Sequence, residues 1–178
     1  LRLQERELAW LTDDQIAELM DSIREGCDNP HVEPIVRICL STGARWSEAE
    51  RSGPTSVRNG VITFSGTKSG KVRAVPISAD LQALLLKHWR QHGPFTSAIT
   101  SFRRALARTT IKLPKGQAAH VLRHTFASHF MQNGGDILTL QKILGHSTVV
   151  VTMRYAHLAP GHFTEAVALA PRMPSAAL

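Results

Sequence analysis

The sequence predicts an α+β fold that is mainly helical and carries one small antiparallel sheet of three short strands. Two observations support this fold class. Most of the chain consists of segments whose apolar side chains recur with a helical period and which end at glycine or proline. One central segment, residues 57–77, instead has a strand-like pattern around the turn signal Asn59-Gly60.

Each expected helix has its own boundary signals. Thr12 and Gln15 have the spacing of a capping box, and the first helix stops near Gly26. The second helix, residues 30–40, is ended by Gly43, and a later helix begins at the cap Ser78 and ends near residue 93. The same reasoning places further helices at residues 97–110, 119–133, 136–144 and 148–154.

The strands are expected on either side of two turns. Val57 precedes the first turn, and an apolar run at 61–64 follows it. A second turn at 67–71 leads into a strand at 72–76, which places Lys68 at the tip of a hairpin. A lysine at such a tip is ordinarily just a solvated charge.

Composition limits the classes of function. The formal net charge of +7 and the pI near 10.1 favour a polyanionic partner. No segment approaches the roughly 18 apolar residues of a membrane span, so no membrane partner and a cytoplasmic location are expected. Two cysteines are too few for a disulfide scaffold, and Cys39 lies in an apolar run where a buried thiol is expected.

The segment 119–129 contains the most informative pattern. Read as a helix, it places His120 and Arg123 three residues apart on one face, close to the helix start. Free backbone N–H groups at a helix start, together with a cation, favour the binding of an anion. Elsewhere, Arg45 and Glu48 have the same spacing, although a surface salt bridge is the ordinary interpretation of such a pair.

Taken together, these motifs resemble the catalytic domain of the tyrosine recombinases, the phage integrase family. The resemblance covers residues 12–157 and is closest to integrases of temperate bacteriophages. One departure is Ser52, where the family often has an apolar residue. It affects where the helix that contains Glu48, the third along the chain, is expected to end, and no site residue. The matching pieces, in chain order, are Thr42-Gly-Ala-Arg45-Trp-Ser-Glu48, Thr67-Lys68, His120-Val-Leu-Arg123-His124, Leu144-Gly145-His146-Ser147 and Tyr155-Ala156-His157.

The resemblance implies a site for a DNA phosphodiester. A phosphodiester under attack gathers negative charge on its non-bridging oxygens, and the planar guanidiniums of Arg45 and Arg123 suit those oxygens. By the same resemblance His146 is a further donor to the phosphate. His120 is either a second donor or the base that activates the nucleophile.

The resemblance also implies the reaction. Tyr155 attacks phosphorus to give a 3′-phosphotyrosine and a free 5′-hydroxyl, and the reverse attack reseals the strand without ATP, metal or any other cofactor. Lys68 is the implied general acid for the departing 5′-oxygen, with Lys71 as a rival on the same turn. Glu48 is expected to hold Arg45 or a histidine in place. We expect structural roles for His124 and His129, and we assign none to His157.

The sequence has features of three other classes of protein. His120 and His124 have the spacing of a zinc-protease helix, but that motif needs glutamate where Val121 stands, and Arg123 would repel a metal ion. A non-catalytic helix-turn-helix module would explain the charge and the two short helices after residue 134, but not Tyr155. A type IB topoisomerase shares the chemistry, and the phage-like motifs and small size favour a recombinase.

The resemblance finally implies an organisation and partners. Residues 1–159 are expected to form the catalytic domain, and residues 160–178 a C-terminal tail that contacts another protomer. Upstream DNA-binding domains are expected to be absent from this chain. The implied partners are duplex DNA attachment sites, further copies in a synaptic tetramer, a dimer through the tail, and accessory DNA-bending proteins. The implied location is the cytoplasm of a bacterial host.

Overall fold

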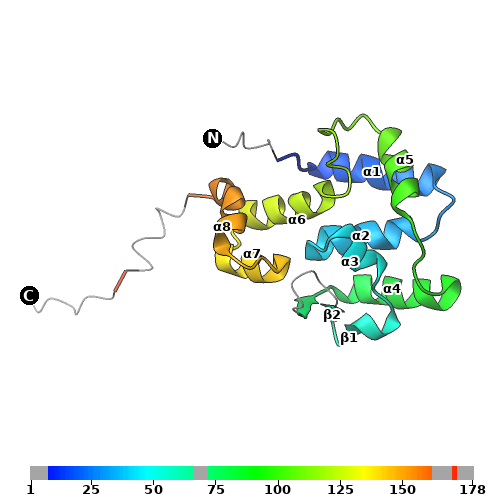
Figure 1. Ribbon diagram of the computed structural model, residues 1–178, viewed down its shortest axis with the longest axis horizontal. Coiled ribbons are helices and arrows are strands. Elements are labelled where there is room, and N and C mark those ends of the chain that lie inside the picture. Colours follow the sequence, from blue (N-terminus) through cyan, green and yellow to red (C-terminus); the bar gives the residue numbers. More distant parts are fainter. Residues whose placement is uncertain (1–7, 66–71, 162–169, 172–178) are drawn as a thin grey trace, which may run out of the picture.

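The computed structural model describes residues 8–65, 72–161 and 170–171 and confirms the expected fold class. Helices predominate, and one antiparallel sheet has the strand order β1-β2-β3. Figure 1 shows α6, α7 and α8 grouped at one side of the molecule and α1 to α5 at the other. Within the described ranges, no helix has both the length and the apolar character needed to cross a bilayer.

The first two helices follow their expected signals. Helix α1, Asp13–Gly26, begins with the complete Thr12–Gln15 capping box. Helix α2, Val32–Thr42, starts and ends two residues later than expected, because the Asn29 side chain accepts a hydrogen bond from the backbone N–H of His31 and forms a turn before it. Gly43 ends α2 in the left-handed conformation, with φ of 64°.

Helix α3, Trp46–Glu50, is a short helix that follows directly on α2. The Ser52 hydroxyl donates to the Ala49 carbonyl at 2.7 Å and closes this helix, which accounts for a polar residue at that position. A 3-10 turn, η1 (Pro54–Ser56), then leads into the sheet.

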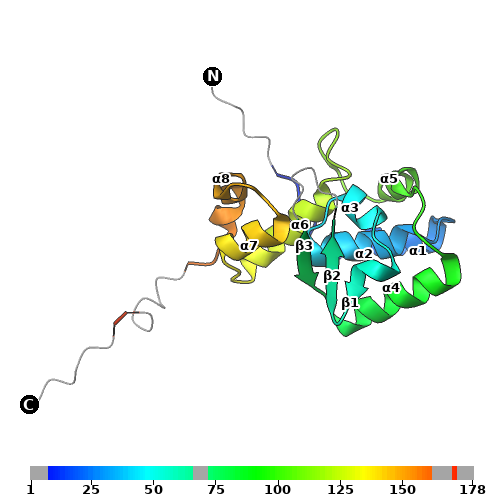
Figure 2. The ribbon, with the colours of Figure 1, turned by 60° about the horizontal axis from the view of Figure 1, so that its bottom comes forward.

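The sheet has the expected turns and register. Strand β1 (Val57–Arg58) pairs with β2 (Val61–Phe64) across Asn59 and Gly60, which both have positive φ as a two-residue hairpin turn requires. Strand β3 (Arg73–Pro76) pairs with β2, so that Phe64 lies opposite Arg73. Figure 2 shows β3 as the edge strand nearest α6 and α7. Lys68, Lys71 and the rest of the second turn lie outside the described residues.

Of the next two helices, one contacts the β1–β2 turn of the sheet and the other packs against α1. Helix α4, Ala79–His92, begins at Ser78, whose hydroxyl accepts from the Leu81 N–H as expected of an N-cap. Helix α5, Ile99–Ala107, is shorter than the predicted 97–110. The helix ends two residues before Thr109, whose hydroxyl donates back to the Leu106 carbonyl in place of further helical bonds.

The C-terminal elements confirm two expectations and correct one. Helix α6 is Val121–Gln132 with His120 as its N-cap, and α7 is Ile137–Leu144 with Asp136 as N-cap and Gly145 in the left-handed conformation. The predicted helix at 148–154 is instead a four-residue helix, α8 (Val149–Thr152), followed by a 3-10 turn, η2 (Met153–Leu158). The five consecutive β-branched residues at 148–152 have a low helix propensity, and the chain continues after them as the tighter 3-10 turn.

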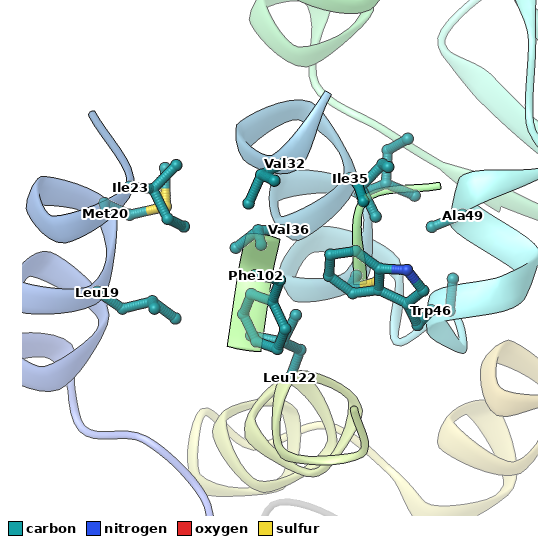
Figure 3. Packing of buried hydrophobic residues seen from close by; sticks show 14 of the residues in the cluster. Leu19, Met20, Ile23, Val32, Ile35, Val36, Trp46, Ala49, Phe102 and Leu122 are labelled. Carbon is teal, nitrogen blue, oxygen red and sulfur yellow. The ribbon is translucent and has the colours of Figure 1, made fainter. Parts of the chain in front are cut away.

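Two apolar clusters hold these elements together. The main cluster joins α1 to α5, the sheet and the start of α6, and Figure 3 shows Trp46 and Phe102 packed at its centre, with ring centroids 4.8 Å apart. The second cluster joins α6, α7 and η2 around Tyr155. Helix α6 takes part in both clusters and therefore fixes the C-terminal elements relative to the rest of the molecule.

Candidate active site

Glu48 lies at the centre of a buried ion-pair network. One carboxylate oxygen accepts from the Arg45 guanidinium at 2.9 Å, and the other accepts from the Arg73 guanidinium at 2.8 Å and from the backbone N–H of Arg45 at 2.9 Å. Burial by itself raises the pKa of Glu48, but the Arg45 N–H and the two guanidiniums outweigh it and hold that pKa below its usual value. Glu48 is therefore ionised at neutral pH. The Arg45 side chain remains 44% exposed, so it faces solvent at the edge of the network.

Arg123 is fixed by the C-terminal ends of two helices. Its guanidinium donates to the Gly43 carbonyl, at the end of α2, and to the Leu144 carbonyl, at the end of α7, both at 2.7 Å. Such carbonyls lack partners within their own helix and carry the negative end of the helix dipole. Burial, followed by repulsion from Arg45 and Arg73, lowers the pKa of Arg123 to about 10, which leaves it charged at neutral pH.

His146 lies beside Arg123, immediately after the glycine that ends α7. Its Nε2 is 3.0 Å from the Arg123 guanidinium, and because arginine only donates, Nε2 accepts and the ring proton is on Nδ1. Nδ1 then donates to the Thr152 hydroxyl at 2.9 Å. Burial and the neighbouring Arg123 and Arg45 lower the pKa of His146 to about 4, so the ring is neutral at neutral pH.

Tyr155 places its hydroxyl against helix α6, which also carries Arg123. The side chain is buried, with 2% exposure, and its hydroxyl is 2.6 Å from Nδ1 of His124. Burial raises the pKa of Tyr155 although Arg123 and Arg154 act in the opposite direction. The side chain therefore stays protonated at neutral pH.

The structure brings together five of the seven site residues predicted from the sequence. Direct contacts, or contacts through Arg73, link four of them: Arg45, Glu48, Arg123 and His146. The fifth, Tyr155, is hydrogen-bonded to His124, the residue next to Arg123. Glu48 forms an ion pair with Arg45, the contact that its expected supporting role requires. His120 is exposed at the start of α6, with its ring centroid 6.3 Å from that of His124. Lys68 lies outside the described residues.

Three site residues were missed by sequence reasoning. Arg73 donates to the Leu144 carbonyl as well as to Glu48, and thus joins β3 to α7. Its inward position in a strand that alternates with buried Val75 was a usable signal. Thr152 orients His146, and His124 holds Tyr155; neither pairing has a local sequence signature. His129 does have a structural contact, since its Nε2 is 2.8 Å from the Leu11 carbonyl and joins the residues just before α1 to α6.

The zinc-protease alternative has no support in the site. His124, one of the two histidines with suitable spacing, directs Nδ1 at Tyr155. Across residues 8–65, 72–161 and 170–171, no three histidine, cysteine or carboxylate side chains are grouped as metal ligands would be.

The site is thus a cluster of fixed guanidiniums and a histidine with a tyrosine hydroxyl at its edge, on a mainly helical α+β domain. The chain belongs to the phage integrase family, whose model matches residues 9–162. It is 51% identical over 170 residues to the integrase of Escherichia phage 186, covering 96% of this chain and 50% of that protein. It is 53% identical over 171 residues to the integrase of Haemophilus phage HP1, covering 94% of this chain and 49% of that protein.

A solved structure shows the same fold. The catalytic domain of bacteriophage HP1 integrase superimposes with a TM-score of 0.82 at 50% identity, covering 91% of this chain and 95% of that one. The chain spans about half the length of the curated phage integrases that it matches.

Proposed function

We propose that this chain is the catalytic domain of a site-specific DNA recombinase that integrates or excises DNA through a 3′-phosphotyrosine intermediate. The observation that carries the proposal is the meeting of Arg45, Arg123 and His146, from three distant segments, beside the hydroxyl of the only tyrosine in the chain. Family membership and two phage integrase relatives near 50% identity support it.

The cluster suits phosphoryl transfer, in which catalysis is mainly positioning and electrostatic stabilisation. Arg45 offers an exposed guanidinium whose orientation Glu48 fixes, and Arg123 adds a second positive charge held by helix ends. A bound phosphate would raise the pKa of His146 and allow Nε2 to donate. Preorganised donors of this kind are each worth on the order of 10²–10³ in rate.

Tyr155 is the proposed nucleophile, and Lys68 the proposed general acid that protonates the departing 5′-oxygen. His120, exposed at the N-terminus of α6, is the proposed further phosphate donor or base. The reaction needs no ATP, because the energy of the broken phosphodiester is kept in the tyrosine–phosphate bond. The substrate is duplex DNA, bound largely through its phosphates, so affinity is expected to fall steeply with salt.

We also propose the organisation implied by the family. Residues 1–159 form the catalytic unit, and residues 160–178 contact a neighbouring protomer through Phe163, Val167 and Leu169, which lie outside the described residues. Recombination of two duplexes requires four active sites, hence a synaptic tetramer, with accessory DNA-bending proteins, in the cytoplasm of a bacterial host. Light scattering of a chain ended at Pro160 tests the tail: unchanged self-association would contradict its role.

A covalent-capture assay tests the reaction. The substrate is a pool of nicked duplexes randomised on both sides of the nick, from which cleaved strands are recovered as SDS-stable adducts. We expect the wild-type chain to form adducts and Tyr155→Phe, which lacks one oxygen atom, to form none. Circular dichroism and DNA binding of the variant serve as controls. Binding without an adduct by the wild-type chain would instead support the helix-turn-helix module.

A further inference from the structure

The hydroxyl of Tyr155 has one imidazole partner among the described residues. His124 follows Arg123 directly on α6, and its Nδ1 lies 2.6 Å from the hydroxyl oxygen. The two residues are 31 positions apart in the sequence, and the Tyr155 ring is fixed in the second apolar cluster. The contact is therefore a defined feature of the packed site.

The direction of this hydrogen bond follows from the chemistry of the two groups. A phenol O–H is more acidic than the N–H of a neutral imidazole, so Tyr155 donates and Nδ1 accepts. His124 then carries its proton on Nε2. Burial, followed by the electrostatic effect of His120, Arg154 and Arg123, lowers the pKa of His124 to about 4 and keeps its lone pair available at neutral pH.

The other basic groups of the site are less well placed for this proton. Both nitrogens of His146 are engaged, Nε2 by Arg123 and Nδ1 by Thr152. His120 is exposed at the helix N-cap, and Arg123 has no lone pair to offer. Since the burial of Tyr155 opposes its ionisation, a group already bonded to its hydroxyl is the most direct acceptor.

We propose that His124 is a catalytic residue, the base that takes the phenolic proton of Tyr155 on Nδ1 as the tyrosine oxygen attacks the DNA phosphorus. This inference rests on the proposed recombinase function. It assigns the base role to His124 and leaves His120 as a donor to the phosphate.

The step balances as follows. The O–H bond of Tyr155 breaks and its proton passes to Nδ1, while the phenolic oxygen bonds to phosphorus. The bond from phosphorus to the 5′-oxygen breaks, and that oxygen leaves with the electron pair and takes a proton from the general acid of the proposed function. His124 becomes an imidazolium, stabilised by the negative phosphoryl group beside it. During rejoining, the imidazolium returns the proton to the departing tyrosine oxygen.

The charged and titratable groups that face His124 determine how its substitution should change the rate of adduct formation. These are His120 and Arg123 on α6 and Arg154 and Tyr155 on η2. His124→Asn places an amide oxygen near the hydroxyl, which accepts a hydrogen bond but takes up no proton. Its adduct formation must therefore draw on the small fraction of tyrosine that ionises unaided.

The test measures adduct formation against pH on a nicked duplex recovered from the capture pool. At neutral pH we expect His124→Asn to react roughly 10²- to 10⁴-fold more slowly than wild type. Its rate should rise roughly tenfold per pH unit below the pKa of the phenol, while the wild-type rate changes little from pH 6 to 8. Replacing Tyr155 by 3,5-difluorotyrosine, a more acidic phenol, should restore much of the lost rate in this variant.

Two variants make the test selective. His129→Asn changes the other partly buried histidine of α6, which contacts Leu11 and Asp13 at the start of α1, and should keep the wild-type rate and pH profile. His124→Gln replaces His124→Asn if the latter does not fold by circular dichroism. The inference is overturned if these His124 variants match the wild-type rate, or if they are slower by a factor that does not depend on pH.

The proposed function fails separately. A wild-type chain that forms no adduct refutes both the function and the inference. Adducts in the wild type, none in Tyr155→Phe and a normal rate in His124→Asn refute only the inference.

Discussion

Arg73→Met tests how far the site depends on its buried ion pairs. Methionine keeps much of the side-chain length but removes the bonds to Glu48 and to the Leu144 carbonyl, and Glu48 is only 3% exposed. Breaking a buried ion pair by removing one partner costs about 3–5 kcal/mol. Because Glu48 keeps Arg45 and Leu144 keeps Arg123, we expect a smaller loss than that range gives, about 2–4 kcal/mol in the free energy of unfolding.

Urea denaturation of the chain measures this loss, with Arg58→Met as the matched control. Arg58 is an exposed arginine of the same sheet, so its substitution should change stability by less than about 0.5 kcal/mol. The double variant Arg73→Met/Glu48→Gln should be more stable than the sum of the two single losses predicts, because it leaves no buried charge unpaired. A loss below about 1 kcal/mol for Arg73→Met would refute the reasoning.

Two further predictions concern the histidines. The pKa values of His88, His124 and His146 are lowered to about 4, so the unfolded chain binds protons more readily than the folded one. The free energy of unfolding should therefore be constant above pH 6.5 and fall progressively towards pH 4. Urea midpoints measured against pH check this, and His88→Gln should weaken the pH dependence. Thr152→Val removes the acceptor that fixes the His146 tautomer and should slow adduct formation about tenfold with DNA binding retained, a loss of about 1.4 kcal/mol. The control Thr109→Val, at the end of α5, should leave the rate unchanged.

Local signals were sufficient for most of the fold. The capping box at Thr12, the left-handed Gly43 and the hairpin turn at Asn59-Gly60 each depend on side-chain or backbone preferences within a few residues. Where the prediction was wrong, at residues 148–154, the β-branched run weakened the helix more than its apolar spacing indicated.

The site was only partly accessible to sequence reasoning. Arg45, Arg123, His146 and Tyr155 could be selected because their motifs occur in the family order. Their contacts could not be derived, since each depends on how distant elements pack. The clearest case is His124. The sequence shows only that it follows Arg123 directly, and the packing of η2 against α6 brings the Tyr155 hydroxyl to its Nδ1.

Arg73 is a second residue whose partners could not be predicted from the sequence. Its inward position follows from strand alternation, yet nothing local indicates that Glu48 and the end of α7 would surround it. A buried arginine requires a partner, so the position alone predicts an ion pair, while the identity of the partner comes from tertiary structure.

The chemistry of the DNA ends and of the linked peptide tests the central claim most directly. After reaction with a captured duplex, mass spectrometry of the digested adduct should find the 3′-phosphate joined to the peptide that contains Tyr155, and polynucleotide kinase should label the released 5′-hydroxyl. DNA linked to any other residue, or an adduct that persists in Tyr155→Phe, would contradict the account.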